Sequence, residues 1–479
     1  MLAVFAGVAL LQCFGQYEAV KLATGARKSL STRARSVESA NERTKSYYWP
    51  SGRGHVGHYS ASVHEAPIDL QSSLAWSWHD PRGRYRTSPC GVNLDDRQNI
   101  YLTSLDGIRK FSVNGTLLWS YEPRRGKGEE LPDTASLYDG AVYCSTTKGR
   151  LFALSMETGK ELWTTKLAST DGNNGFVTAF DGVVLTGSDV GEMNRGRRLP
   201  GRNADQLVTG LNATDGTVLW TFKPEAPVWN FMGSFAGDGT FVFQDYEGRA
   251  YRNRVSDGRN LWKNGGRNNT WTDGSALLGP NGVVYTVNTH ELVVGGKTDE
   301  GGDVSAFRLA DGKQLWSAVV PRVPNNMPAI GRLAGKEGLS LVQPIGQQCA
   351  RGQRTDVYAL DAETGAVQWV FNGPTLKGDA VAGDDNIMAV IQRVTSGVRP
   401  ITLPNPWSAP SIDARGTVYI GNENGPLYSL RDENGDGKVA DKEVSTYDAK
   451  ACFVGSSGAA IGENMMAIAS IDALYVFKG

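Results

Sequence analysis

The chain has 479 residues, of which 40% are hydrophobic and 21% charged, as in an ordinary globular protein. Its 49 basic and 50 acidic side chains leave a net charge of −1, which excludes the strong overall field that draws nucleic acid or an anionic membrane. No apolar run reaches the ~20 residues of a membrane-spanning helix, so we expect neither nucleic-acid binding nor a transmembrane segment.

The chain begins with a short apolar run, residues 1–15, that is typical of the core of a signal peptide but lacks the usual basic start. Residues 16–65 are basic and rich in Ser, and we expect a disordered leader or linker there. This order predicts a secretory, endomembrane or extracellular location. A two-part leader of the kind found on plastid proteins of algae with complex plastids is an alternative, and both interpretations stay open.

Three of the five histidines lie close together at His55, His58 and His64. Their spacing matches no compact zinc pattern and no cysteine is near, so we expect a solvated tail rather than a metal site.

From residue 109 onward one short pattern recurs, in which a Gly stands four residues before a Trp. The six tryptophans are Trp119, Trp163, Trp220, Trp262, Trp316 and Trp369. Successive tryptophans are 42 to 57 residues apart, and a period of about 40–50 residues with short strands and Gly turns predicts the blades of a β-propeller. The bulky Trp that closes each hairpin is expected to act as a wedge between neighbouring blades.

The most complete copy of the pattern comprises Ala359, Asp361, Thr364, Gly365 and Trp369. It closely resembles the quinoprotein-type (PQQ-like) repeat, and the resemblance covers most of residues 66–479. It implies an all-β, eight-bladed propeller of four-stranded antiparallel blades. The family contains quinone-dependent alcohol dehydrogenases and non-catalytic relatives such as the bacterial outer-membrane barrel-assembly lipoprotein, so the fold leaves the function open.

The two ends of this region complement each other. Residues 66–79 contain a strand-like run without preceding partner strands, whereas residues 454–479 contain three strands without a closing Trp strand. We therefore expect residues 73–79 to form the outer strand of the last blade and to close the ring, which removes an open sheet edge.

Four cysteines lie within the repeats, at Cys90, Cys144, Cys349 and Cys452. We favour buried thiols, although a bridge near the ring closure stays open because spacing does not fix connectivity. Insertions at 187–203, 290–302 and 346–354 are expected to form loops on the propeller rim, where protein or peptide partners bind.

In place of the seventh hairpin turn stands DENGDGKVADKE, residues 432–443, which fills every required position of an EF-hand calcium loop. The expected ligands are the side chains of Asp432, Asn434, Asp436 and Glu443 and the backbone carbonyl of Lys438. A strand-like segment precedes the loop where an EF-hand has a helix, so the likeness is confined to the loop. An acidic turn without calcium is the alternative. For an unpaired loop we expect an affinity of ~10⁻⁵–10⁻³ M.

No set of catalytic residues stands out, which favours a non-enzymatic, calcium-binding scaffold for protein partners. The alternative is a PQQ-dependent dehydrogenase with quinone and calcium in the central channel, for which Asp245 and Asp273 are candidate bases. The adjacent cysteine pair that catalytic members often carry is missing from this sequence. A calcium-regulated sensor would further need a two-state element, and the sequence identifies none.

Overall fold

The structure is a computed structural model. It describes residues 47–83, 89–123, 129–167, 175–188, 205–266, 270–272, 274–290, 301–324, 326–346, 352–377, 381–383, 391, 406–453 and 457–479. Residues 1–46 and nearly all of the three expected insertions lie outside this set. In the described part of the chain, no helix is long and apolar enough to cross a membrane.

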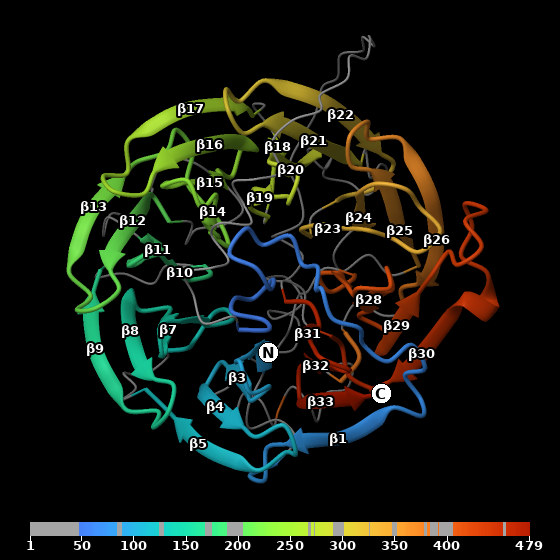
Figure 1. Cartoon of the computed structure of the whole chain (residues 1–479), viewed down its shortest axis with the longest axis horizontal. Coiled ribbons are helices and arrows are strands. Elements are labelled where there is room, and N and C mark those ends of the chain that lie inside the picture. Colours follow the sequence, from blue (N-terminus) through green and yellow to red (C-terminus); the bar gives the residue numbers. More distant parts are fainter. Residues whose placement is uncertain are drawn as a thin grey trace.

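The described strands form eight antiparallel sheets arranged in a ring, which confirms the predicted propeller (Figure 1). Blade 1 contains β2 (Pro89–Leu94), β3 (Ile100–Ser104), β4 (Gly107–Phe111) and β5 (Leu117–Tyr121). Blade 2 contains β6 (Ser136–Tyr138), β7 (Ala141–Ser145), β8 (Arg150–Ser155) and β9 (Glu161–Lys166). Blade 3 contains β10 (Thr178–Phe180), β11 (Val183–Ser188), β12 (Leu207–Asn212) and β13 (Val218–Phe222). Blade 4 contains β14 (Ser234–Phe235), β15 (Thr240–Gln244), β16 (Arg249–Arg254) and β17 (Asn260–Gly265).

Blade 5 contains β18 (Thr270–Trp271), β19 (Leu277–Leu278), β20 (Val283–His290), β21 (Gly302–Arg308) and β22 (Gln314–Val320), with β18 and β19 both paired to β20. Blade 6 contains β23 (Ala329–Gly331), β24 (Ser340–Ile345), β25 (Arg354–Asp361) and β26 (Val367–Thr375). Blade 7 contains β27 (Ser411–Ile412), β28 (Val418–Gly421), β29 (Pro426–Leu430), the 3-10 turn η1 (Asp441–Glu443) and β30 (Val444–Asp448). Blade 8 contains β31 (Ala460–Gly462), β32 (Met465–Ala469), β33 (Ala473–Lys478) and β1 (Leu74–His79).

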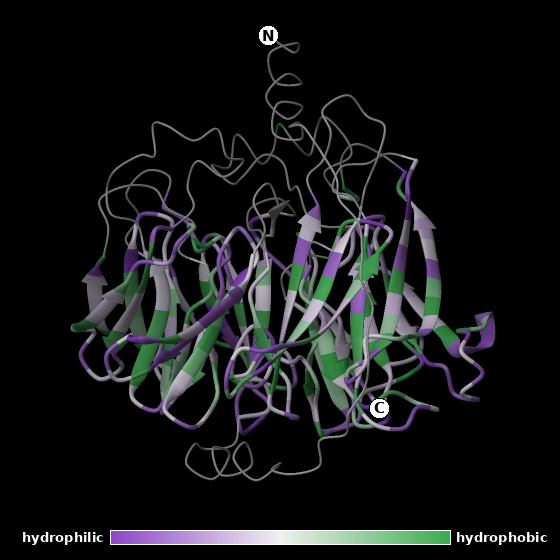
Figure 2. Cartoon of the chain, turned by 90° about the horizontal axis from the view of Figure 1, so that it is seen from above, coloured by the Kyte–Doolittle hydropathy of each residue, from purple (hydrophilic) through white to green (hydrophobic). Residues whose placement is uncertain are grey.

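The burial of each strand follows its place in the blade. All residues of β7 are buried, whereas every residue of the rim strand β9 is exposed or half-buried. Inner strands are covered by neighbouring blades on both faces, but a rim strand has one side toward solvent. Figure 2 shows the strands running between the two faces of the ring, with polar residues gathered in many of the turns.

The repeated Trp and Gly join neighbouring blades, as the sequence predicts. In blade 3 the indole N–H of Trp220 donates to the carbonyl of Val255 in blade 4, at 2.7 Å. Gly258, in the next turn of blade 4, has φ +69°, and a Cβ there would lie 2.5 Å from the Trp220 ring. Only glycine meets both demands. The same contact recurs in the pairs Trp76–Gly115, Trp119–Gly159, Trp163–Gly216, Trp262–Gly312 and Trp316–Gly365.

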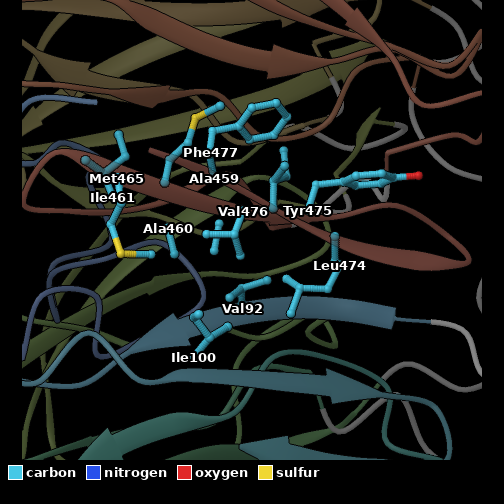
Figure 3. Packing of buried hydrophobic residues seen from close by; sticks show 14 of the residues in the cluster. Val92, Ile100, Ala459, Ala460, Ile461, Met465, Leu474, Tyr475, Val476 and Phe477 are labelled. Carbon is cyan, nitrogen blue, oxygen red and sulfur yellow. The ribbon is translucent and has the colours of Figure 1, made fainter. Parts of the chain in front are cut away.

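The ring is closed as predicted, because β1 pairs antiparallel with β33 and places Trp76 opposite Val476 and Trp78 opposite Leu474. Behind this seam lies an apolar cluster that joins blade 8 to blade 1 (Figure 3). In it, residues such as Ile461 and Val476 of blade 8 are buried together with Val92 of blade 1. The seam is therefore packed like the interior of a domain.

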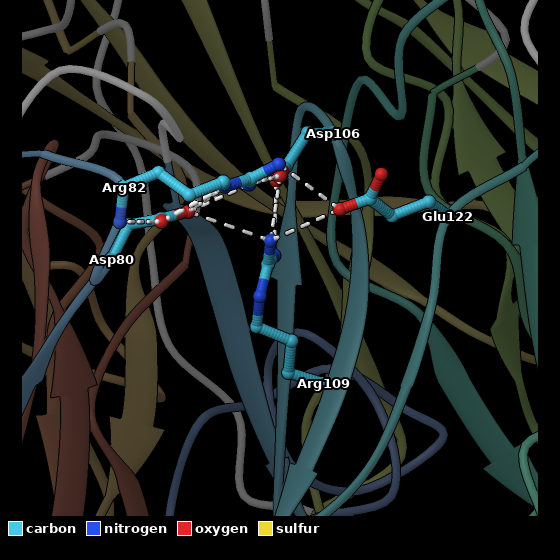
Figure 4. Close-up of polar contacts among 5 residues, drawn as sticks. All are labelled: Asp80, Arg82, Asp106, Arg109 and Glu122. Carbon is cyan, nitrogen blue, oxygen red and sulfur yellow. Dashed lines mark hydrogen bonds and ion pairs between the residues drawn. The ribbon is translucent and has the colours of Figure 1, made fainter.

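Charged side chains reinforce the same seam (Figure 4). Arg109 of β4 lies 2.6 Å from Asp106 and 3.6 Å from Asp80, which follows β1. Arg82 bridges the same two carboxylates at 2.6 and 2.7 Å, and Glu122 lies 3.2 Å from Arg82. The end of the closing strand is thus tied to blade 1 by a partly buried ion network.

Residues 47–62, which we call the central segment, run through the middle of the ring (Figure 1). The sequence places them in a disordered leader and predicts a solvated histidine tail, but His58 is fully buried and His55 and His64 are only partly exposed. The polar, Gly-containing composition is typical of a linker. However, the inner strands present backbone groups toward the ring centre, and this segment satisfies many of them.

Three of the four cysteines, Cys90, Cys144 and Cys452, are buried, in agreement with the interpretation as core residues, and Cys349 lies outside the described part. Cys144 is a free thiol whose pKa is raised by burial, so it is unreactive at neutral pH.

Candidate functional site

The expected calcium loop lies between β29 and β30 of blade 7, where the other hairpins have a tight Gly turn. This replacement explains an irregularity in the Trp pattern. Trp369 of blade 6 is almost fully buried, but within the described part of the chain its indole N–H has no hydrogen-bond partner, because blade 7 offers no Gly turn for it. Val439 of the loop packs instead against the apolar cluster that contains Trp369.

The first half of the loop is curled by its own side chains. Asp432 Oδ2 accepts a hydrogen bond from the amide of Gly437 at 3.0 Å, and Gly437 has φ +85°. Asn434 Oδ1 accepts from the amide of Asp436 at 2.9 Å, and Asp436 Oδ1 accepts from the amide of Lys438 at 2.9 Å. These bonds turn the backbone around one point, as a calcium loop requires.

Glu443 at the end of η1 ties the two halves of the loop together. Its Oε1 accepts from the amide of Glu433 at 2.9 Å, and its Oε2 accepts from the amide of Ala440 at 3.0 Å. The carboxylate is largely buried and faces the loop, which is the placement expected of the bidentate ligand.

Asp432 is the most buried of the expected ligands, with 1% of its surface exposed, and its Oδ1 has no hydrogen-bond partner among the residues that the structure describes. Its Oδ2 lies 2.6 Å from the ammonium of Lys336, which also donates to the carbonyl of Gly435 at 3.2 Å. Lys336 lies in the turn between β23 and β24 of blade 6. No signal in the sequence links it to the loop, because the two meet only across a blade interface.

The expected ligands are gathered only in part. Asn434 and Asp436 meet, with Nδ2 3.2 Å from Oδ2. Among the described residues, however, no three His, Cys, Asp or Glu side chains are close enough together to hold one metal ion. The carboxylates instead accept backbone amides or face Lys336. The donor set and the unpartnered Asp432 Oδ1 fit a hard cation, which would have to draw the remaining oxygens inward.

The centre of the ring is occupied by the central segment. His58 lies between Ser51 Oγ, 3.1 Å from its Nδ1, and Thr178 Oγ1, 2.9 Å from its Nε2. Burial, together with the nearby charge of Arg53, lowers the pKa of His58 to about 3, so its ring is neutral at pH 7. Arg53 is also fully buried and donates to the carbonyls of Met327 and Pro328.

Backbone hydrogen bonds connect the central segment to the inner strands around the ring. The amides of Leu137, Phe235, Leu278, Ile330 and Ile412 donate to the carbonyls of Pro50, Val56, Gly57, Tyr59 and Ser60, at 2.7 to 2.9 Å. Trp49 exchanges two backbone bonds with Leu94. These contacts reach blades 1, 2, 4, 5, 6 and 7, and His58 adds blade 3.

The described residues at the ring centre do not fit a quinone. The inner strands that surround the ring centre are bonded to the chain's own residues 49–60. A cofactor would have to displace buried groups such as Arg53 and Trp49.

Comparison with known proteins agrees with the repeat and the fold. The family described as outer membrane protein assembly factor BamB matches residues 106–291 and 204–399, together more than half of the chain. The chain belongs to the BamB family of PQQ-like repeat propellers.

Individual relatives fall into two groups. The BamB of Yersinia pestis is 24% identical over 283 residues, covering 59% of this chain and 67% of that protein. The dehydrogenase subunit of the quinone alcohol dehydrogenase of Komagataeibacter europaeus is 28% identical over 148 residues, covering 28% of this chain but only 19% of that subunit. The crystal structure of quinohemoprotein alcohol dehydrogenase from Comamonas testosteroni superposes with a TM-score of 0.60 at 13% identity, covering 93% of this chain and 84% of that one, which shows the shared fold alone.

Asp245, one of the two candidate bases, has a structural role in this BamB-family chain. Burial raises its pKa, and its carboxylate lies 3.0 Å from Arg249 and accepts from Tyr251 at 2.8 Å. It also accepts the amides of Glu247 and Arg249, so it organises the β15–β16 turn. Asp273, the other candidate, lies outside the described residues.

Glu423, which no sequence signal indicates, is a buried acid whose carboxyl group has a raised pKa. It lies in the β28–β29 turn with 4% of its surface exposed, and within the described residues no hydrogen bond or ion pair reaches its carboxylate. Burial raises its pKa to about 7. The folded state therefore holds a proton that the unfolded chain releases near pH 4.5.

Replacing this acid should change how stability depends on pH. The contribution of Glu423 is favourable below pH 4.5 and is lost as pH rises through 7, where a charged carboxylate becomes buried. Glu423→Gln should therefore stabilise the protein by about 2 kcal/mol at pH 8.5 and change little at pH 5. Urea unfolding at both values measures this. The exposed Glu363→Gln is the control, and equal effects at both pH values would contradict the assignment.

Proposed function

We propose that the protein is a non-enzymatic BamB-like propeller that binds protein or peptide partners and carries one calcium ion in loop 432–443. The match to BamB over more than half of the chain supports the scaffold role. The observation that carries the proposal is the central segment, which is bonded to the inner strands around the ring and would have to move for a cofactor to enter the ring centre.

Calcium would serve as a structural clamp in blade 7. The ligands would be Asp432, Asn434, Asp436, Glu443 and the carbonyl of Lys438, all oxygens, which is the donor type that Ca²⁺ prefers. Elsewhere a Trp on a Gly turn holds the outer hairpin to its neighbour, but Trp369 lacks that turn. The ion would supply the missing rigidity.

A secretory or extracellular location agrees with this role. Extracellular calcium modules bind with dissociation constants of ~10⁻⁴–10⁻³ M, within the range expected of a single unpaired loop. The leader that would direct the chain there comprises residues outside the described part.

Calorimetric titration of calcium tests the metal site. The parent chain should show one saturable binding event and a higher melting temperature in calcium. Glu443→Ala should lose both, because it removes two ligand oxygens. Glu433→Ala, which changes a neighbouring acid that is no expected ligand, should retain them. A parent without binding heat and without a melting shift would reduce the loop to an acidic turn.

The alternative, a quinone-dependent dehydrogenase, is suggested by the partial match to the alcohol dehydrogenase subunit. Equilibrium dialysis with pyrroloquinoline quinone and calcium, followed by a dye-coupled alcohol oxidation assay, separates the two functions. We expect neither retention of quinone nor dye reduction. Stoichiometric quinone binding with alcohol-dependent dye reduction would overturn the scaffold proposal, whereas cross-linking in the source cells to defined protein partners would support it.

A further inference from the structure

We propose that Lys336 and a calcium ion bind alternately to Asp432. Calcium binding would then break the Lys336–Asp432 ion pair between blades 6 and 7, which we call the latch. This inference rests on the calcium site proposed above and assigns its regulation to a residue of a different blade. Three features of the structure carry it: the position of the ammonium, the unpartnered oxygen of Asp432 and the backbone contact beside them.

The Lys336 ammonium lies inside the same turn that a cation would occupy. It is 2.6 Å from Asp432 Oδ2 and donates to the carbonyl of Gly435 at 3.2 Å, and its side chain is only 13% exposed. Lysine is a compact positive charge without a fixed planar geometry, so it can stand in for a cation among oxygens. No described residue bonds to Asp432 Oδ1, which leaves one oxygen of the same carboxylate available to a metal.

Simultaneous occupation is disfavoured by charge. A calcium ion ligated by Asp432 Oδ1 would lie about 2.3–2.6 Å from that oxygen. The ammonium on Oδ2 of the same carboxylate would then lie within roughly 5 Å of a divalent ion, at a site that solvent screens poorly. Since the metal also gains four further ligands, the lysine is the group that leaves. Its flexible stem allows the ammonium to move into solvent.

The backbone contact explains how the blades stay together after the exchange. Gly335 has φ +67°, and a Cβ there would lie 2.4 Å from the carbonyl oxygen of Asp432 and 2.7 Å from Gly435. The two turns therefore touch through backbone that does not depend on the ammonium. Calcium exchange replaces the Lys336–Asp432 ion pair at the blade interface with the metal ion, while the backbone contact keeps the two turns adjacent.

Calcium titrations of Lys336→Met and Lys442→Met test the latch. Both variants remove one positive charge at the loop, but Lys442 is exposed and is no expected ligand. We expect Lys336→Met to bind calcium about tenfold more tightly than the parent and Lys442→Met to differ by no more than about twofold.

A second measurement uses the parent protein itself. Acetylation of lysines with an activated ester, followed by mass spectrometry, should modify Lys336 several-fold faster in saturating calcium than in chelator. The exposed Lys313 in the turn after β21 should react equally in both conditions.

The outcomes separate the latch from the calcium site. Calcium binding by the parent, with unchanged affinity in Lys336→Met and unchanged acetylation of Lys336, would overturn the latch and leave the calcium site standing. Absence of calcium binding in the parent and in both variants would overturn the site and the latch together. Binding by Lys336→Met alone would identify the lysine as a permanent replacement for the ion and would overturn the exchange.

Discussion

A chain that begins at residue 63 should melt roughly 10 °C below one that begins at residue 47. The shorter chain lacks the central segment, so at least six backbone hydrogen bonds to the inner strands are lost. Each lost bond leaves a buried inner-strand amide or carbonyl in need of water, at about 1 kcal/mol or more. Loss of the buried Trp49 alone should cost about 3–5 kcal/mol.

Differential scanning calorimetry of the two chains, at equal concentration and pH, measures this effect. Trp49→Ala in the longer chain is the companion variant, because it keeps every backbone bond and removes only apolar packing. The melting temperature of Trp49→Ala should lie between those of the two chains. Equal melting temperatures would show that water can hydrogen-bond to the backbone groups of the inner strands and that the central segment does not contribute to stability.

Replacing Arg109 by Met should be the most damaging single change at the ring closure, with an expected loss of about 3–5 kcal/mol at pH 7. Arg109 is buried and makes two hydrogen bonds to Asp106, at 2.6 and 3.0 Å. It also lies 5.2 Å above the Trp78 ring of the closing strand. Met fills much of the volume but leaves Asp106 and Asp80 with less compensating charge.

Chemical denaturation at pH 7 and pH 3 tests both the size and the electrostatic origin of the loss. Burial by itself would raise the pKa of Asp80, but its hydrogen bonds to Arg82 and the charges of Arg82 and Arg109 lower it overall. A carboxylate with a lowered pKa stabilises the fold above its ordinary value, and this contribution is lost as pH falls. The deficit of Arg109→Met should therefore shrink at pH 3. A deficit that is equal at both pH values would assign the effect to packing on Trp78. Arg82→Met, at a more exposed position, should cost less.

Much of the fold follows from the sequence because its causes are local or repeated. The Gly–Trp period predicts blades, since a Gly turn and a bulky rim residue are needed once in each hairpin. The unmatched strands at the two ends predict the closing strand β1, because a four-stranded blade with one strand missing has an open edge. The curl of loop 432–443 is also local, since Asp432, Asn434 and Asp436 bond to amides within a few residues.

Other features arise only when distant parts of the chain meet. The composition of the central segment predicts a polar linker, but its position is decided by backbone groups of six blades and by the His58–Thr178 contact with blade 3. From the sequence, Asp245 is a candidate base, but in the structure its carboxylate is held by Arg249 and Tyr251. Glu423 gains its raised pKa from burial, which no neighbour in sequence reveals. Lys336 reaches Asp432 only because blades 6 and 7 are adjacent.

The sequence by itself determined the repeat, the closure and the loop, because these depend on local geometry. The tertiary structure decided what occupies the centre and what faces the loop, because burial and charge contacts there come from several blades at once.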